Sequence, residues 1–135
     1  MNKEEVLQKL NDLSKNTLGE HIGMTFTHVE NGLLKGSVPV DQRTVQPYGI
    51  LHGGVSAVLA ETLGSIGSHM IAESEDKRAF GIEINSQHLR PVKEGSIHGT
   101  AKIIHKGKTI HTWHIDIHND QGKLISISKL IVAIR

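Results

Sequence analysis

The stretch from residue 46 to residue 65 constrains this chain more than any other part of its sequence. A proline and a glycine interrupt regular structure near its start, and residues 52–72 then read as one long helix of mostly apolar and small residues. Glu61 is the only Asp, Glu, Lys or Arg between Arg43 and Glu73. Because a helix that is apolar on nearly all sides must be covered, the rest of the chain has to surround it.

The segments around this helix have the patterns of strands. The short connections between them are rich in glycine, which indicates hairpins and therefore an antiparallel sheet. We expect one α+β domain over residues 1–135, in which a curved antiparallel sheet wraps around the central helix. Residues 1–18 would add an N-terminal helix over residues 3–16. The predicted strands cover residues 21–29, 34–40, 79–89, 96–106, 109–118 and 123–134.

Composition narrows the range of functions. Lys and Arg total 15 and Asp and Glu total 14, so the net charge of +1 offers no bulk attraction to nucleic acid or to an acidic membrane. The absence of cysteine excludes a disulfide scaffold, thiolate chemistry and a cysteine-based zinc site. The charged N-terminus lacks the apolar core of a signal peptide, and no run of about 18 apolar residues occurs. We therefore expect a cytoplasmic protein without nucleic-acid or membrane partners.

Helical periodicity divides the central segment into faces. One face is an apolar stripe that contains Leu59, Leu63, Ile66 and Met70. A second face is small and polar, so that a ligand or a backbone can approach it closely. Its members are Gly54, Ala57, Glu61, Ser65 and Ser68.

The start of the helix carries a second chemical feature. Gly53 and Gly54 expose backbone N–H groups, and the first turn of a helix has unsatisfied donors at the positive end of its dipole. Such donors can stabilise a carbonyl oxygen that becomes negative during acyl transfer. Glu61 lies roughly 12 Å further along the helix, at about 1.5 Å per residue. This separation favours a site to which two symmetry-related chains contribute, one the helix start and the other the carboxylate.

These features also have purely structural explanations. Glu61 would be a buried carboxylate paired with a histidine, because an isolated buried charge is costly. His52 would only cap the helix, and the adjacent glycine pair would only allow close packing. No Walker pattern and no G-x-G-x-x-G motif is present.

Two other polar clusters lie on the predicted strands. The turn at residues 105–109 (HKGKT) suits a phosphate through its cations and free backbone N–H groups, although a solvated hairpin explains it equally well. His114, Asp116 and His118 share one face of a strand. We interpret them as a solvent-facing stripe and expect no metal site.

The central stretch also resembles a known family. Residues 45–54 (VQPYGILHGG), running into residues 60–62 (AET), resemble the hotdog-fold acyl-CoA thioesterases. The branch is the one that contains glutamate-type 4-hydroxybenzoyl-CoA thioesterases and 1,4-dihydroxy-2-naphthoyl-CoA thioesterases. The likeness extends over residues 20–134 and includes residues 85–92 (NSQHLRPV) and the turn at 105–109.

The resemblance implies hydrolysis of an acyl-CoA thioester and a set of site residues. Glu61 corresponds to the catalytic carboxylate of the family, and Gly53 to the residue whose N–H polarises the thioester carbonyl. His52 and Gln46 correspond to residues that position the thioester and water, and Ser65 to a hydroxyl that contacts the acyl portion. The pantetheine and nucleotide path corresponds to Gly81, His88, Leu89, Arg90, Pro91, Lys106, Gly107, Lys108 and Thr109.

The resemblance also has implications for cofactors and for the oligomeric state, and two features limit how far it can be transferred. It implies no separate cofactor, because coenzyme A is part of the substrate, and a site between subunits of a homodimer, two of which usually form a homotetramer. Lys108 stands where relatives often have Arg, so the charge is kept but bidentate phosphate geometry is lost. The N-terminal helix varies in such proteins and is expected to carry no information about the substrate.

Two other functions fit parts of the pattern. A hydratase or dehydratase of acyl thioesters also uses a His and an acid near this helix, and here His52 precedes Glu61. A non-catalytic acyl-CoA-binding module would have little need of an isolated carboxylate. The acyl group stays open between aryl, including 1,4-dihydroxy-2-naphthoyl, and medium-chain aliphatic. Tyr48 is the one aromatic residue near the helix start and is expected to contact the substrate.

Overall fold

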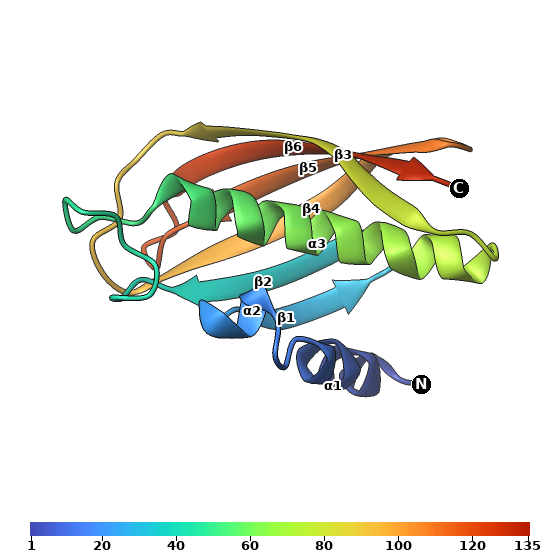
Figure 1. Cartoon of the computed structure of the whole chain (residues 1–135), viewed down its shortest axis with the longest axis horizontal. Coiled ribbons are helices and arrows are strands. Elements are labelled where there is room, and N and C mark those ends of the chain that lie inside the picture. The colour runs from blue at the N-terminus through green and yellow to red at the C-terminus, as the bar shows by residue number, and fades with distance from the viewer.

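The chain folds into one antiparallel sheet of six strands together with three helices. The computed structural model describes all residues, 1–135. In chain order the elements are α1 (Lys3–Leu13), α2 (Leu18–His21), β1 (Thr25–Glu30), β2 (Leu33–Pro39), α3 (Gly53–Ser74), β3 (Ala79–His88), β4 (Ser96–Lys106), β5 (Ile110–His118) and β6 (Leu124–Ile134). Across the sheet the strand order is β1-β2-β4-β5-β6-β3, and α3 lies along one face of it (Figure 1). The predicted α+β architecture of a sheet around a central helix is confirmed.

The prediction for the N-terminal segment is wrong in its details. The first helix ends at Leu13 rather than at residue 16, and residues 18–21 form a second short helix instead of leading into a strand. Asn16 adopts a left-handed backbone conformation with φ of 63°, which a helix cannot continue through. Thr17 then takes an extended conformation and begins α2. The first strand therefore starts only at Thr25.

The central helix packs its apolar stripe closely against the middle of the sheet. Leu59 and Leu63 are fully buried, and they lie over Gly36 of β2 and Gly99 of β4, which are directly paired. A Cβ atom added to Gly99 would lie 3.0 Å from Leu63 Cδ1 and 3.1 Å from Leu59 Cδ2. The absence of side chains at these two strand positions lets the helix approach the sheet.

Ser68 does not lie on the exposed polar face where periodicity placed it. Its hydroxyl is fully buried, accepts a hydrogen bond from Trp113 Nε1 at 2.8 Å and is hydrogen-bonded to His111 Nδ1 at 2.8 Å. Trp113 reaches this level of the helix because Gly64 and Gly67 present no side chains to it, and a Cβ atom on Gly67 would overlap with the indole ring. Packing against Trp113 therefore buries Ser68, although helical periodicity places it on the same face as the polar residues of α3.

The buried histidine predicts a pH-dependent stability. Burial, aided by the nearby cation of Lys106, holds the pKa of His111 below its ordinary value of 6.5. Below about pH 6.5 the unfolded chain therefore binds a proton that the folded chain resists, so stability should fall as the pH drops towards the folded-state pKa. We expect His111→Asn, which retains a polar atom but does not titrate, to flatten this slope in thermal unfolding curves between about pH 7.5 and pH 5.5.

The pH dependence of stability must be compared between the wild type and His111→Asn, because other histidines pair with carboxylates on the surface. His98 pairs with Asp120 at 2.7 Å, and His28 with Glu30 at 3.0 Å. Both pairs are present in the wild type and in the variant and lie apart from His111, so their contribution cancels when the two slopes are compared. An unchanged slope in the variant would show that His111 does not produce the dependence.

Helix α3 is both long and apolar. By length and composition alone it is apolar enough to cross a membrane, and 56% of its most apolar window is buried inside the protein. Contacts with β2, β3, β4, β5 and β6 account for that burial. Its apolar character is that of a core helix.

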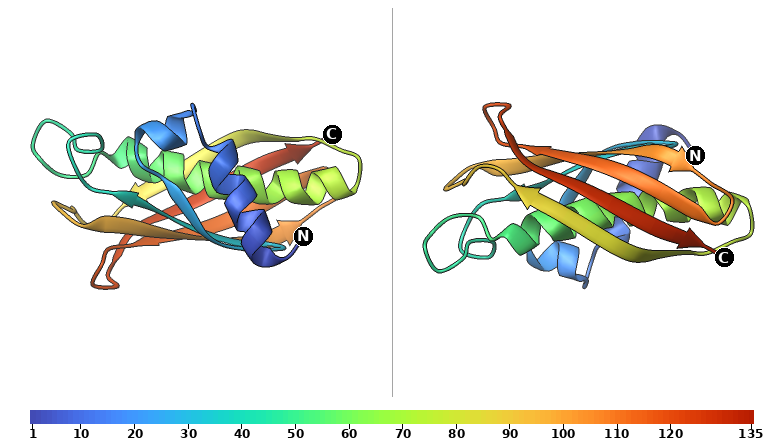
Figure 2. Two further views of the ribbon diagram at one scale, coloured as in Figure 1. Left: turned by 90° about the horizontal axis from the view of Figure 1, so that it is seen from below. Right: turned by 90° about the horizontal axis from the view of Figure 1, so that it is seen from above.

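Strand β3 forms one edge of the sheet and pairs with β6 alone. Two large apolar side chains on it stay exposed, Phe80 at 47% and Ile82 at 56%. Unpaired backbone groups and exposed apolar side chains make such an edge a surface for strand pairing. The right-hand view of Figure 2 shows β3 at this margin, alongside β6.

Candidate active site

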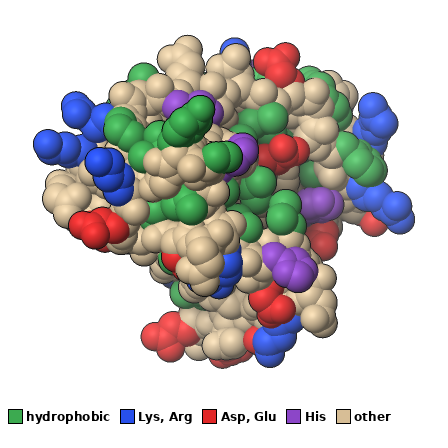
Figure 3. Space-filling view, turned by 60° about the vertical axis from the view of Figure 1, so that its left-hand side comes forward, with side chains coloured by type: hydrophobic (Ala, Val, Ile, Leu, Met, Phe, Trp, Pro, Cys, Tyr) green, Lys and Arg blue, Asp and Glu red, His purple; other side chains and the backbone are tan.

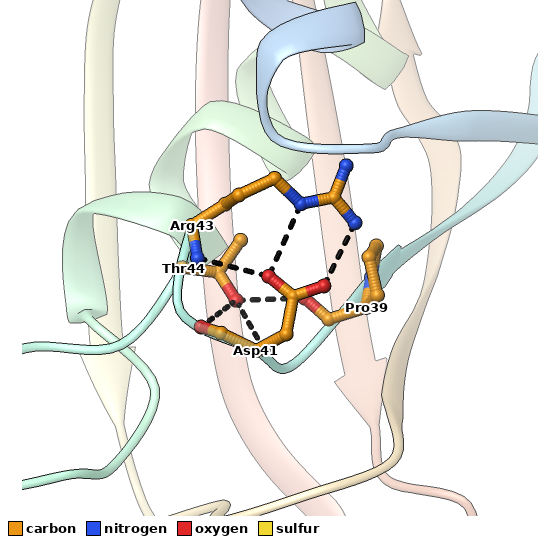
Figure 4. A network of polar contacts seen from close by, with 4 residues as sticks. All are labelled: Pro39, Asp41, Arg43 and Thr44. Carbon is orange, nitrogen blue, oxygen red and sulfur yellow. Dashed lines mark hydrogen bonds and ion pairs between the residues drawn. The ribbon is translucent and has the colours of Figure 1, made fainter.

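The loop before the central helix is fixed by a polar network around Asp41 (Figure 4). The Asp41 carboxylate accepts hydrogen bonds from Arg43 Nη2 at 2.7 Å and from Arg43 Nε at 3.1 Å, and the guanidinium holds the pKa of Asp41 below its ordinary value. The Thr44 hydroxyl donates to the Pro39 carbonyl at 2.7 Å. The Thr44 carbonyl in turn accepts the His52 N–H at 2.9 Å, so this network sets where α3 begins.

The first residues of α3 present one free backbone donor. His52 is the N-cap, and its Nδ1 accepts the Gly54 N–H at 2.8 Å, so the capping role considered for this residue is observed. The Val55 N–H donates to the His52 carbonyl at 3.0 Å. The Gly53 N–H forms no hydrogen bond within the chain. A free donor at the positive end of a 22-residue helix is suited to hold a carbonyl oxygen.

A cavity of about 480 Å³ opens at this helix start. It brings together six of the predicted site residues, from the loop before α3, from α3 itself and from the segment after β3. Three apolar residues and a serine that the sequence did not point to complete its wall. The lining residues are Gln46, Ile50, Leu51, Gly53, Ser56, His88, Leu89, Arg90, Pro91 and Ile125.

Close contact between the start of α3 and the end of β3 shapes this cavity. A Cβ atom on Gly53 would lie 2.6 Å from His88 Nε2, so only glycine leaves room for the imidazole. The chain then turns where the Leu89 N–H donates to the Ile125 carbonyl at 2.8 Å. Gln46 stays within its own loop, where its Oε1 accepts the Tyr48 N–H. The Tyr48 side chain is 91% exposed and does not line the cavity.

Glu61 lines a different cavity, of about 390 Å³. Ser65 lies beside it one turn along the helix, as predicted, and Gly81 of β3 faces both. A Cβ atom on Gly81 would lie 3.0 Å from Glu61 Oε2 and 3.7 Å from Ser65 Oγ. The remaining lining residues, none of which was predicted as a site residue, are Leu18, Val58, Thr62, Ile66 and His69.

The structural alternative, in which Glu61 is buried and paired with a histidine, is not observed within one chain. The Glu61 side chain is exposed and forms no ion pair or hydrogen bond in the chain. The physical reason is its neighbour, because Gly81 on the edge strand offers no side chain that would cover the carboxylate. A structural pair between Glu61 and a histidine is therefore excluded within one chain.

The basic turn between β4 and β5 lies far from the helix start. The Thr109 carbonyl accepts the Ile134 N–H at 2.9 Å, and Ile134 pairs with Ala79 at the beginning of β3. His88, which borders the first cavity, is at the other end of this ten-residue strand. At about 3.3 Å per residue the two regions are roughly 30 Å apart. The predicted residues Lys106, Gly107, Lys108 and Thr109 therefore do not join that cavity in one chain.

The side chains of the predicted polar stripe on β5 are partly exposed, and two of them pair with each other. His114 Nε2 lies 2.8 Å from Asp116 Oδ1, and both side chains are about two-fifths exposed (43% and 42%). No group of three or more His, Cys, Asp or Glu residues in the chain has the spacing of a metal site. In the space-filling view, histidine and acidic side chains interrupt the hydrophobic surface rather than forming one charged patch (Figure 3).

The fold and the two cavities together define the class of this protein. A long helix lies against an antiparallel sheet, which is the arrangement of the hotdog fold, and this helix has a free N–H at its start and an open carboxylate two turns later. The chain belongs to the thioesterase superfamily, whose family model matches residues 48–126. The predicted hotdog fold and membership in this family are both confirmed.

Individual relatives agree with this assignment over nearly the whole chain. The chain is 40% identical to a proofreading thioesterase, EntH, of Klebsiella pneumoniae, covering 98% of this chain and 96% of that protein. It is 38% identical to a 1,4-dihydroxy-2-naphthoyl-CoA hydrolase of Escherichia coli, covering 95% and 93%. The crystal structure of a thioesterase from Haemophilus influenzae superposes with a TM-score of 0.91 at 40% identity, covering 96% and 90%. The protein is a thioester hydrolase.

Proposed function

We propose that this protein hydrolyses an aryl- or medium-chain acyl-CoA thioester to the free acid and coenzyme A, with Glu61 as the catalytic carboxylate. The Gly53 N–H would hold the thioester carbonyl oxygen, and His52 and Gln46 would position the thioester and the attacking water. One relative is named a 1,4-dihydroxy-2-naphthoyl-CoA hydrolase, which makes this aryl thioester one candidate substrate.

One observation carries the proposal: the free N–H and the open carboxylate occupy two separate cavities of the same chain. Gly53 and Glu61 are eight residues apart on one helix, or roughly 12 Å along its axis. A single thioester group cannot contact both from one chain. Two chains that exchange these parts would form two complete sites.

The exposed edge strand supports such an exchange. A two-fold axis through the middle of β3 would pair it antiparallel with its copy, because a two-fold interface brings the same surface together. His88 at the end of β3 would then lie near Gly81 of the partner subunit, towards the start of that strand. Glu61 packs over Gly81 within each chain, so this pairing carries the partner's Glu61 towards the Gly53 end of the first chain.

The chemistry of such a site follows from the two groups. As a general base, Glu61 takes a proton from water, the hydroxide adds to the thioester carbon, and the Gly53 N–H stabilises the oxyanion. The C–S bond then breaks and the thiolate of coenzyme A leaves and is protonated. As a nucleophile, the carboxylate itself displaces the thiolate and forms an anhydride that water hydrolyses. A single turnover in ¹⁸O-water separates the routes, since only the anhydride route transfers label into Glu61.

The substrate's remaining parts have candidate partners. Ser65 lies beside Glu61 and would contact the acyl group, and Arg90 borders the helix-start cavity. Lys106 and Lys108 would meet the phosphates of a coenzyme A that extends across the subunit boundary. No separate cofactor is needed, because coenzyme A is part of the substrate. A homodimer, or a tetramer of two dimers, and a cytoplasmic location are part of this proposal.

A thiol-release assay tests the proposed function. We expect free coenzyme A to form from benzoyl-, 1,4-dihydroxy-2-naphthoyl- or medium-chain acyl-CoA, with the panel also including short- and long-chain thioesters and an acyl-carrier-protein thioester. Absence of thiol release from every acyl-CoA would contradict the proposal. Addition of water to an enoyl-CoA without thiol release would instead identify a hydratase.

A further inference from the structure

An apolar groove separates α1 from the second half of α3. The left-hand view of Figure 2 shows α1 crossing α3 there, and a cavity of about 440 Å³ lies between the two helices. Six of its nine lining residues are apolar, and the charged Lys9 and Glu73 also border it. The apolar residues are Met1, Val6, Leu10, Leu13, Ile66 and Met70.

This groove is a built feature of the fold, because α1 is anchored to the sheet. Asn11 Oδ1 accepts the Phe26 N–H at 2.8 Å, and Asn11 Nδ2 donates to the Phe26 carbonyl at 3.1 Å. Leu10 packs into the core on the neighbouring helical position and is only 7% exposed. Leu13, at the end of α1, is 62% exposed and extends the groove to the surface.

The groove adjoins the Glu61 cavity. Ile66 and His69 line both of them, so the two spaces share a wall on α3. From Glu61 to Glu73 the helix advances twelve residues, roughly 18 Å at about 1.5 Å per residue. A ligand whose reactive carbon lies at Glu61 therefore has an apolar path along α3, past Ile66 and under α1.

We propose that the groove between α1 and α3 receives the distal, apolar end of the acyl group and thereby favours medium-chain acyl thioesters. The inference rests on the proposed role of Glu61, which places the carbonyl end of the substrate. The groove volume lies within the range of small-ligand sites, about 300–1,000 Å³, and its wall is mainly apolar, as in such sites. The N-terminal helix, from which the sequence predicted no information about the substrate, would then set the preferred chain length.

A chain-length series tests this inference with a variant that fills the groove. In the wild type, kcat/KM for butanoyl-, hexanoyl-, octanoyl- and decanoyl-CoA should rise by roughly fourfold for each methylene that becomes buried. Leu13→Trp fills the outer end of the groove and should remove this rise for the last two methylenes, so that its loss grows with chain length and reaches about sixteenfold for decanoyl-CoA. Glu5→Trp adds the same ring to an exposed position of α1 outside the groove and should retain the wild-type series.

A second variant and a binding assay separate the groove from the proposed hydrolysis. Leu13→Lys places a charge in the groove without bulk and should produce the same trend. Calorimetry with the unreactive thioethers S-butyl- and S-decyl-CoA measures the preference without turnover. Tighter binding of S-decyl-CoA that Leu13→Trp weakens would support the groove even if no thioester were hydrolysed, in which case only the proposed function fails.

Three results would overturn the inference. The first is a wild-type series that is flat in both assays. The second is an equal loss at all chain lengths in Leu13→Trp. The third is a change of oligomeric state in Leu13→Trp by sedimentation, which would assign the groove to a second copy of the chain.

Discussion

Replacing Glu61 by glutamine is expected to lower kcat by about 10²–10⁴-fold, the usual contribution of a general base. The amide keeps the size of the side chain but cannot accept the proton of water or attack a thioester. Since Glu61 is exposed and forms no ion pair or hydrogen bond in its own chain, the variant should fold and unfold like the wild type. Thiol release and thermal unfolding measured on the same preparation check both statements.

A matched control and a mixing experiment sharpen this result. Glu73→Gln makes the same change at an exposed position of the same helix and should leave the hydrolysis of short-chain acyl-CoA intact. Gly53→Val should also be inactive, because its side chain would collide with the His88 ring. When the two inactive variants are refolded together in equal amounts, about a quarter of the wild-type activity should return if each site draws on two chains. Full activity in Glu61→Gln, or no recovery on mixing, would refute the shared carboxylate.

Replacing Gly67 by alanine is expected to destabilise the fold, although alanine is the better helix former by about 1 kcal/mol. The added methyl group would overlap with the ring of Trp113, which is fully buried and hydrogen-bonded to Ser68. Overpacking of this kind costs typically about 1–3 kcal/mol or more. The net effect should be a lower Tm and a lower midpoint in urea.

Gly19→Ala provides the comparison for this variant. Gly19 also lies in a helix, but its added Cβ atom would meet nothing closer than 3.6 Å. The same substitution should therefore leave stability unchanged or raise it by up to about 1 kcal/mol. A Tm of Gly67→Ala at or above that of the wild type would show that the indole can move, which the packing described above does not allow.

The sequence predicts those parts of this fold that depend on local patterns. The central helix was expected over residues 52–72 and covers Gly53–Ser74, and strand β4 has its predicted limits. Alternation and helical spacing suffice there because each element has one buried side. At Asn16 a single left-handed residue ends the first helix early, and nothing in the hydrophobic pattern signals that conformation.

The sequence predicts which side chains of α3 lie together at the site, but not which residues of the sheet cover them. The helical positions of Ser65 and Glu61 place them together, as the cavity shows. Helical spacing also puts Ser68 on nearly the same face, yet Ser68 is buried while Glu61 is open. The difference arises in other strands, because Ser68 meets Trp113 of β5 whereas Glu61 meets Gly81 of β3. Long-range neighbours of this kind cannot be derived from the spacing along one helix.

The position of β3 also has a consequence for how the chain folds during synthesis. Within its own chain β3 pairs only with β6, the last strand to be made, and the pairing of Ala79 with Ile134 spans most of the C-terminal half. While β4 and β5 are being synthesised, β3 has no partner within the chain on either side. Non-local pairing of this kind slows folding, and the unpaired strand stays exposed meanwhile. Completion of the sheet therefore waits for the eleven-residue strand β6, and a chain truncated before β6 would leave β3 without any partner and β5 unpaired along one side.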